Sequence, residues 1–406
     1  MRTMPERRIS RTTCMTGRIG HWKWKAGCLN RARGGAARKR QELRLTQILA
    51  NQGEGHAETF AWSQSGSPPS HLTLTSTQSA EPQLLLIHPI GVGLSSRFWD
   101  RFVGVWERGN DTAVMISPDL LGCGTAPCPA RPLTPEDWAD PLIDLIQEQH
   151  SGPVVLVSQG ASLPIALEFL AKAPELVSAL VAISPPGWPV LKQNVSLSRA
   201  RWLWRFFFNG AFGNLFYRYA RRRGFLDKFS RNNLFARAEA VDAEWLQMLR
   251  EGSRAMETRW AVYSFLAGFW RRDWEPQLTG LDIPVQIIFG TDATGIGSSK
   301  SWDDLNQRLR TYREKMPNAS ISTIPGRNVL PYESSEECVL CIKDWIAALQ
   351  PWTQAKHRDR SSSSPPWHVF MHSKQRETSI DAELGFSKSQ LLALASKLTA
   401  RMVVIC

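Results

Sequence analysis

Hydroxyl and imidazole side chains, which together carry acyl transfer in many hydrolases, occur where two apolar runs of the sequence end. Ser158 and Ser162 stand on either side of Gly160, between the apolar run PVVLVS and the helical pattern ASLPIALEFLAKA. His88 ends a second apolar run, QLLLIH. A serine beside a histidine base could form a covalent acyl-enzyme. Ser158, however, is expected to end a buried strand and Ser162 to lie one turn into a helix, which favours structural roles for both hydroxyls.

The cysteines predict neither disulfides nor a metal site. They are seven in number, scattered, and not preceded by an apolar secretory segment, which indicates reduced thiols in a cytosol-like compartment. Cys338 and Cys341 have C-x-x-C spacing but lie in the periodic apolar pattern CVLCIKDWIAAL, and no second ligand pair is visible. A buried helix face explains this pair, so we expect no metal and no other cofactor.

Short apolar runs alternate with helical patterns through the middle of the chain, and we predict strands for the former and helices for the latter. The predicted order is strand 83–88, helix 97–108, strand 112–119, helix 135–150, strand 153–158, helix 161–173, strand 177–184, strand 284–290, helix 301–315, strand 319–326 and helix 334–349. This alternation predicts an α/β fold whose mainly parallel sheet is covered by helices on both faces.

Residues 185–283 separate two of these strands and are far too long for an ordinary connection. Their pattern is mostly helical, which predicts a helical cap over the carboxyl ends of the strands. Open α/β sheets bind their ligands at those ends.

The first part of the predicted cap has an unusual composition. No Asp or Glu occurs from Leu176 to Leu226, whereas seven arginines and nine aromatic residues lie between Arg199 and Arg223. Three interpretations are open. The segment could make peripheral contact with an anionic membrane. It could instead be a lid over a small apolar or acyl ligand whose acidic head an arginine holds, or cap core with a solvated arginine rim.

The net charge of +12 is concentrated at the two ends of the chain. Residues 1–45 carry thirteen Lys and Arg against two Glu, and residues 351–406 carry eight basic against four acidic residues. The middle of the chain therefore has a net charge of −3. Since a nucleic-acid-binding face would place its positive charge on the folded domain, we expect no nucleic-acid binding by the core.

The domain organisation follows from these patterns. We predict a basic disordered N-terminal extension at 1–57, a core at 58–184 and 284–350, the cap at 185–283, and a Ser/Pro linker with a short C-terminal helix at 351–406. The extension resembles an organelle transit peptide, although serine is nearly absent from it, and an upstream start codon would look the same. No stretch is apolar enough to span a membrane. A cytoplasmic location is expected, with organelle targeting as the alternative.

Three motifs within residues 58–350 resemble the α/β-hydrolase superfamily with a helical cap after the sixth strand. HPIGVG, which begins at His88, looks like its His-Gly oxyanion loop. SPDLLGCGTA (117–126) is similar to its Asp-Leu-x-Gly turn, and PVVLVSQGASLPIALEFLAKAPE (153–175) to its strand–elbow–helix unit. The resemblance implies a Ser-acid-His triad whose nucleophile lies on a sharp turn, with two backbone N–H groups stabilising the oxyanion.

The positions that this resemblance assigns to the triad hold residues that cannot do its chemistry. The nucleophile position falls on Gly160, which has no side chain, and the acid position holds Ala293. The histidine position holds Asn328, which cannot carry a proton at neutral pH. The resemblance also implies that the backbone N–H groups of Ile90 and Ala161 are oxyanion donors.

We therefore predict a hydrolase-like protein that lacks the triad and binds an apolar or lipid-like small molecule under its cap. The predicted ligand contacts are His88, Ile90, Gly160, Ala161 and Asn328. One alternative is an active esterase- or lipase-like hydrolase with a displaced nucleophile such as Ser158 or Ser162. The other is a non-catalytic interaction protein.

Overall fold

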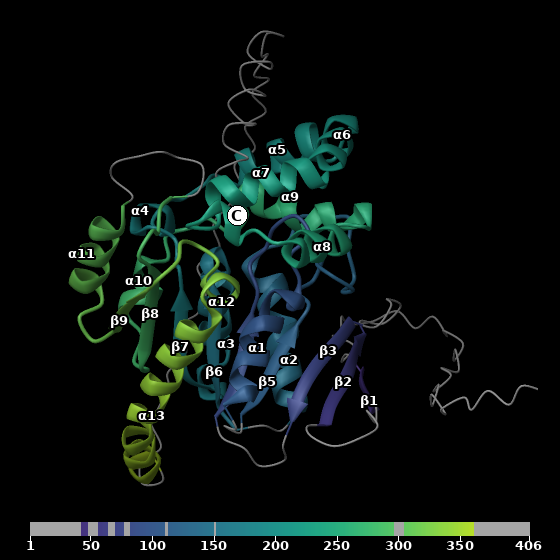
Figure 1. Cartoon of the computed structure of the whole chain (residues 1–406). Helices are drawn as coiled ribbons and strands as arrows, with labels where there is room; N and C mark the ends of the chain where they lie inside the picture. The colour runs from purple at the N-terminus through teal and green to yellow at the C-terminus, as the bar shows by residue number, and fades with distance from the viewer. Residues whose placement is uncertain are drawn as a thin grey trace, which may run out of the picture. The chain divides into compact units, whose positions relative to one another are not determined.

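The computed structural model describes residues 42–47, 56–63, 70–76, 82–109, 113–149, 152–295 and 304–360. Within them a single sheet contains nine strands (Figure 1). The strands are β1 (Glu42–Gln47), β2 (His56–Ser63), β3 (Ser70–Ser76), β4 (Gln83–Ile87), β5 (Val114–Pro118), β6 (Val154–Gln159), β7 (Val177–Ile183), β8 (Val285–Gly290) and β9 (Ser320–Ile324).

The strand order across the sheet is β1-β2-β3-β5-β4-β6-β7-β8-β9. Strands β1 to β3 are antiparallel and join the sheet through β5, whereas β4 to β9 are parallel to one another. The chain leaves β4 toward one edge of the sheet, to β5, and leaves β6 toward the other edge, to β7. The carboxyl ends of β4 and β6 therefore form a switch point, where open α/β sheets bind ligands.

Helices cover both faces of the sheet because the side chains of each central strand alternate between two apolar clusters. Leu84 and Leu86 share one cluster with α1 and α13, whereas Leu85 and Ile87 share the other with α2, α3 and α11. All four side chains are fully buried, as expected for a parallel strand covered on both sides. This confirms the predicted fold class. The core helices are α1 (Asp100–Arg108), α2 (Pro135–Glu148), α3 (Leu163–Lys172), α11 (Leu305–Lys315), α12 (Leu330–Glu333) and α13 (Ser335–Arg360).

The segment between β7 and β8 is helical, and Figure 1 shows most of it standing at the carboxyl end of the sheet. We call this segment the cap. It contains α4 (Trp188–Leu191), α5 (Leu197–Leu203), a π-helical stretch (Trp204–Phe208), α6 (Ala211–Ala220), α7 (Arg223–Asn233), α8 (Ala243–Gly252), α9 (Arg259–Ala267) and α10 (Glu275–Thr279).

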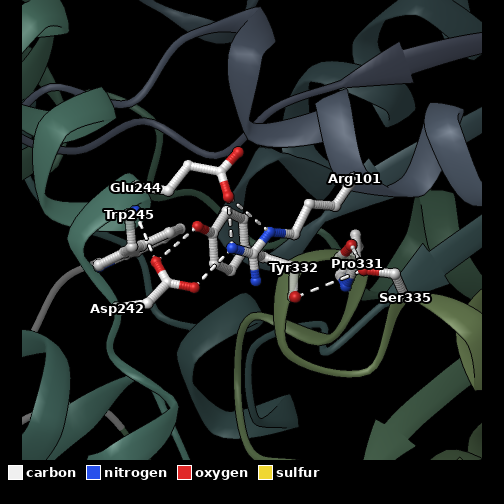
Figure 2. Close-up of polar contacts among 7 residues, drawn as sticks. All are labelled: Arg101, Asp242, Glu244, Trp245, Pro331, Tyr332 and Ser335. Carbon is white, nitrogen blue, oxygen red and sulfur yellow. Dashed lines mark hydrogen bonds and ion pairs between the residues drawn. The ribbon is translucent and has the colours of Figure 1, made fainter.

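A polar cluster fastens the cap to the core (Figure 2). Arg101 of α1 forms ion pairs with Asp242 and Glu244 at the start of α8, and its guanidinium lies 3.9 Å from the ring centroid of Tyr332 in α12. Asp242 also accepts hydrogen bonds from the backbone N–H of Trp245 (2.8 Å) and from the Tyr332 hydroxyl (3.0 Å). One carboxylate thus caps α8 and joins it to two core helices.

Two boundaries differ from those predicted. Strand β1 and the first residues of β2 lie inside the range 1–57, so the prediction of disorder is wrong for those residues. Helix α13 continues through 351–360, where a linker was predicted. The remainder of the predicted N-terminal extension and C-terminal segment lies outside the described residues. No helix among the described residues is both long and apolar enough to cross a membrane.

Candidate functional site

Gly160 occupies a sharp turn between β6 and α3, at the switch point of the sheet. Strand β6 ends at Gln159, and a short 3-10 turn over Gly160–Ser162 leads into α3. The backbone of Gly160 is left-handed, with φ +59°. This is the strained strand-to-helix turn on which hydrolases of this fold carry their nucleophile. The predicted elbow is therefore present, and a glycine occupies its apex.

Close packing does not require a glycine at this apex. A Cβ added to Gly160 would meet only the main-chain oxygen of Ser184 within 4 Å, at 4.0 Å, apart from its chain neighbours. By contrast, a Cβ at Gly124 would lie 2.3 Å from Asp119 Oδ2. A Cβ at Gly160 would thus meet no close contact.

Two polar groups beside this turn were not singled out by the sequence. Ser184, directly after β7, is buried and is the one non-glycine residue with positive φ (+46°) among those described. Its Oγ and the Oε1 of Gln159 are buried without a hydrogen-bond partner within the described part of the chain. Such orphaned atoms and backbone strain concentrate at functional sites. Neither feature has a signature in sequence, since both depend on what surrounds the residue.

The two serines that flank Gly160 are structural. Ser158 Oγ is buried and lies 3.4 Å from the Val181 main-chain oxygen, to which it donates. Ser162 Oγ accepts a hydrogen bond from the Gln159 N–H (3.1 Å) and lies 2.8 Å from the Gln159 carbonyl oxygen and 3.1 Å from that of Ile87. Both side chains are at most 1% exposed. Both hydroxyls are engaged with main-chain atoms, which disfavours either one as a displaced nucleophile.

His88 joins two loops rather than lining a site. Its Nδ1 lies 2.9 Å from the Pro89 main-chain oxygen, and its Nε2 accepts a hydrogen bond from the Leu120 N–H at 3.0 Å. The proton of the neutral ring must therefore be on Nδ1. Burial lowers the pKa of His88, and the opposing effects of the Asp119 carboxylate and of the hydrogen bond to Pro89 do not reverse this. Both nitrogens are thus engaged inside the protein, and the contact of His88 with a ligand stays a prediction.

The predicted acid position contains no carboxylate that reaches the turn. Ala293 is buried after β8, and its neighbour Asp292 is exposed and accepts a hydrogen bond from the Thr291 hydroxyl (2.9 Å). Asp292 is thus not a shifted replacement for the missing acid.

Asn328, at the predicted histidine position, is a buried cross-link. Its Nδ2 donates to the main-chain oxygens of Asn233 in the cap (2.8 Å) and Thr294 after β8 (3.2 Å). Its backbone N–H donates to the Leu234 oxygen (3.0 Å), and its own carbonyl accepts from Gln159 Nε2 (2.6 Å). Asn328 lies next to the elbow, as predicted. Its contact with a ligand stays a prediction, as do those of the Ile90 and Ala161 N–H groups.

A narrow apolar cavity of about 40 Å³ lies between the cap and the loop after β4. Val92 and Leu94 of that loop form one wall, and Leu234 forms another. The Leu234 oxygen is also the one that accepts the Asn328 N–H, so the cavity borders the turn after β9. The remaining lining residues, all from the cap, are Phe216, Ala220, Phe225, Leu226, Phe229, Trp245, Leu249, Val262 and Leu266. The five predicted ligand contacts do not line it.

The C-x-x-C pair behaves as its periodicity predicted. Cys338 is fully buried against the sheet and Cys341 packs beside it, both as free thiols on α13. Burial raises the pKa of both thiols, which disfavours the reactive thiolate. Within the described residues, no group of three or more His, Cys, Asp or Glu side chains is placed to hold a metal ion.

Comparison with other sequences places this geometry among known proteins. Residues 84–339 match the model of a family described as the alpha/beta hydrolase family. A stretch of 107 residues is 33% identical to the lipase LipV of Mycobacterium tuberculosis, and one of 106 residues is 30% identical to the uncharacterized protein Rv2715 of the same organism. Each stretch covers 26% of this chain. The chain spans only 38% and 30% of the lengths of these relatives.

Solved structures extend the likeness over most of the chain. A thermophilic esterase from Thermogutta terrifontis superposes with a TM-score of 0.53 at 17% identity, covering 73% of this chain and 99% of the esterase. A putative acyltransferase from Salmonella enterica gives a TM-score of 0.55 at 16% identity, covering 72% of this chain and 95% of that protein. At such identities the likeness concerns the fold alone. The family model matches more than half of the residues of this chain, and the chain therefore belongs to the alpha/beta hydrolase family.

Proposed function

We propose that this protein binds a small apolar or acyl ligand beneath its cap and does not perform serine-hydrolase chemistry. The observation that carries the proposal is Gly160, a glycine at the apex of the elbow where a Cβ would meet no close contact. An acyl-enzyme needs a nucleophilic atom at that place, and a proton-carrying base beside it. Asn328 supplies no such base, and the flanking serines use their hydroxyls elsewhere.

Two features favour a binding role for the vacant elbow. The side chains that line the cavity under the cap are apolar. An alkyl group could therefore move from water into the cavity without breaking a hydrogen bond of the protein. The N–H groups of Ile90 and Ala161 would suit a carbonyl or carboxylate, and the buried, unpartnered Gln159 Oε1 and Ser184 Oγ would be further polar partners for a ligand that reached the switch point. A ligand with a polar end and a short alkyl group would combine the two features.

Binding of a fluorescently labelled short-chain fatty acid tests the proposal, since the cavity is small. Leu266→Trp fills the cavity from a partly buried position, and Leu340→Trp adds the same bulk at an exposed position of α13 as a matched control. We expect Leu266→Trp to weaken binding about ten-fold, equivalent to roughly two buried methylenes at ~0.8 kcal/mol each, and Leu340→Trp to leave it unchanged. Equal binding by both variants, or none by the wild type, would favour the alternative of a protein-interaction role.

A fluorophosphonate probe tests the catalytic half of the proposal. The wild type should remain unlabelled at every serine, including Ser184. A labelled serine whose replacement by Ala abolishes both labelling and ester hydrolysis would overturn it.

A further inference from the structure

Large apolar side chains that face solvent gather on one side of the cap. Among the described residues, five of the six exposed large hydrophobic side chains belong to residues 197–219. We define the cap patch as four of these: Phe206 (64% exposed), Phe212 (41%), Leu215 (68%) and Tyr219 (50%). An exposed cluster of this kind marks an interaction surface, whereas single exposed apolar residues are ordinary.

The geometry of α6 brings three members of the cap patch together. Phe212, Leu215 and Tyr219 are three and four residues apart and therefore form one stripe along α6. The opposite side of the helix is buried through Gly213, Tyr217 and Ala220. Figure 1 shows α6 at the outer edge of the cap, away from the sheet.

Aromatic contacts fix the positions of Phe206 and Phe212 in the cap patch. The rings of Phe207 and Phe212 are 4.1 Å apart, and those of Trp202 and Phe206 are 5.7 Å apart. At the far end, Tyr219 contacts Phe225, which stacks with Phe229 and lines the apolar cavity. The patch is thus continuous with the cavity wall.

The charged residues within the segment that carries the cap patch are all basic. Arg205, Arg218 and Arg222 are exposed beside it, and none of the three makes an ion pair within the described part of the chain. No acidic residue occurs from Leu176 to Leu226.

An arginine-lined groove adjoins this segment. Arg223, Arg250 and Arg254 line an open groove of about 500 Å³ between the start of α7 and α8. Its one acidic residue, Glu251, is paired with Arg97. Arg221, directly after α6, joins the end of α6 to the end of α8 by donating to the main-chain oxygens of Ser253 (3.2 Å) and Arg254 (2.8 Å). The groove and the cap patch are therefore held on connected helices.

We infer that the cap docks on an anionic lipid surface, with the cap patch entering the interface and the arginines contacting headgroups. Exposed aromatic and aliphatic side chains flanked by unpaired arginines are the composition of interfacial helices. A nucleic acid would use the arginines but would gain little from Leu215 and Phe206. Binding to a protein partner would not by itself require the absence of acidic residues from a segment of about fifty residues. This inference does not depend on whether the cavity binds a ligand.

Co-sedimentation with vesicles of phosphatidylcholine, with and without phosphatidylserine, tests the inference. Arg218→Gln with Arg222→Gln should weaken binding to phosphatidylserine vesicles about five-fold per arginine at low salt, and much less at high salt. Leu215→Ser with Phe206→Ser should weaken it at every salt concentration, because the apolar contribution is not screened. All four positions are exposed, so melting temperatures should stay close to that of the wild type.

Matched controls lie on the far helices. Arg310→Gln with Arg313→Gln on α11 removes the same charge, and Leu340→Ser on α13 removes an equally exposed apolar side chain. These variants should bind vesicles like the wild type. Equal losses in the controls, equal binding to vesicles without phosphatidylserine, or no vesicle binding would overturn the inference. So would binding to RNA that the arginine variants weaken and the Leu215 variant does not.

Discussion

The side-chain Nε2 of Gln159 donates a hydrogen bond to the main-chain oxygen of Asn328, with the two atoms 2.6 Å apart. This contact joins the elbow after β6 to the turn after β9, the two places between which an active hydrolase of this fold passes a proton. Asn328 also holds the cap through Asn233. The position expected for a base thus serves here as a structural link.

Asn328→Asp should be strongly destabilising. The carboxylate has the same shape but cannot donate to the two carbonyl oxygens that Nδ2 contacts, so a buried charge would face two acceptors. We expect a loss of about 3 kcal/mol or more in the free energy of unfolding at neutral pH. Chemical denaturation measures it, with Asn318→Asp in an exposed loop as the control. Similar stability of the two variants would contradict the cross-link.

Gly160→Ala and Gly160→Ser should each cost stability without creating an esterase. The space around the Cβ is open, so the cost is that of a side chain in a left-handed backbone, ~1–2 kcal/mol. The added hydroxyl has no base to activate it. Thermal melting and hydrolysis of a short-chain nitrophenyl ester check both expectations. A Gly160→Ser variant that hydrolyses the ester well above the Gly160→Ala variant would show that a base is present after all.

Ser162→Ala should destabilise the protein more than Ser158→Ala. Loss of the Ser162 hydroxyl leaves the buried Gln159 N–H without its acceptor, at a cost of about 1–3 kcal/mol. Ser158 makes a single long contact of 3.4 Å, so its removal should cost less. Urea unfolding of the two variants measures the difference. The reverse order would mean that the elbow does not depend on Ser162.

His88→Gln should change how stability depends on pH. Because the folded protein lowers the pKa of His88, the unfolded chain takes up the proton first as pH falls through the ordinary value of 6.5. This contribution to stability is complete above that pH and is lost below it, at no more than about 1.4 kcal/mol per pH unit. Glutamine can accept from the Leu120 N–H but does not titrate.

The gap in unfolding free energy between wild type and His88→Gln should therefore be largest above pH 6.5 and should narrow as the pH falls below it. Denaturation at a series of pH values measures that gap. A gap that is constant with pH would mean that His88 is not held neutral.

Local sequence patterns determined most of the core. Apolar runs such as VVLV and LLLI and the helical periods between them are short-range signals, and each predicted core strand and helix from β4 onward is present. The position of Gly160 at the elbow was also readable, because the strand and helix on either side of it are strongly patterned. The same holds for Cys338, whose burial follows from helical periodicity.

Only the tertiary structure decided what the polar residues do. The motif around His88 suggested a ligand contact, but its Nε2 is taken by Leu120, a residue that the fold brings from another loop. Ser184 has a positive φ, and its buried hydroxyl has no hydrogen-bond partner among the described residues. No local sequence pattern predicts either feature. Likewise, the aromatic residues of the cap divided into buried and exposed sets only when α6 packed, with Tyr217 inside and Tyr219 outside. Periodicity states which residues share a face, whereas the surface that meets each face depends on distant parts of the chain.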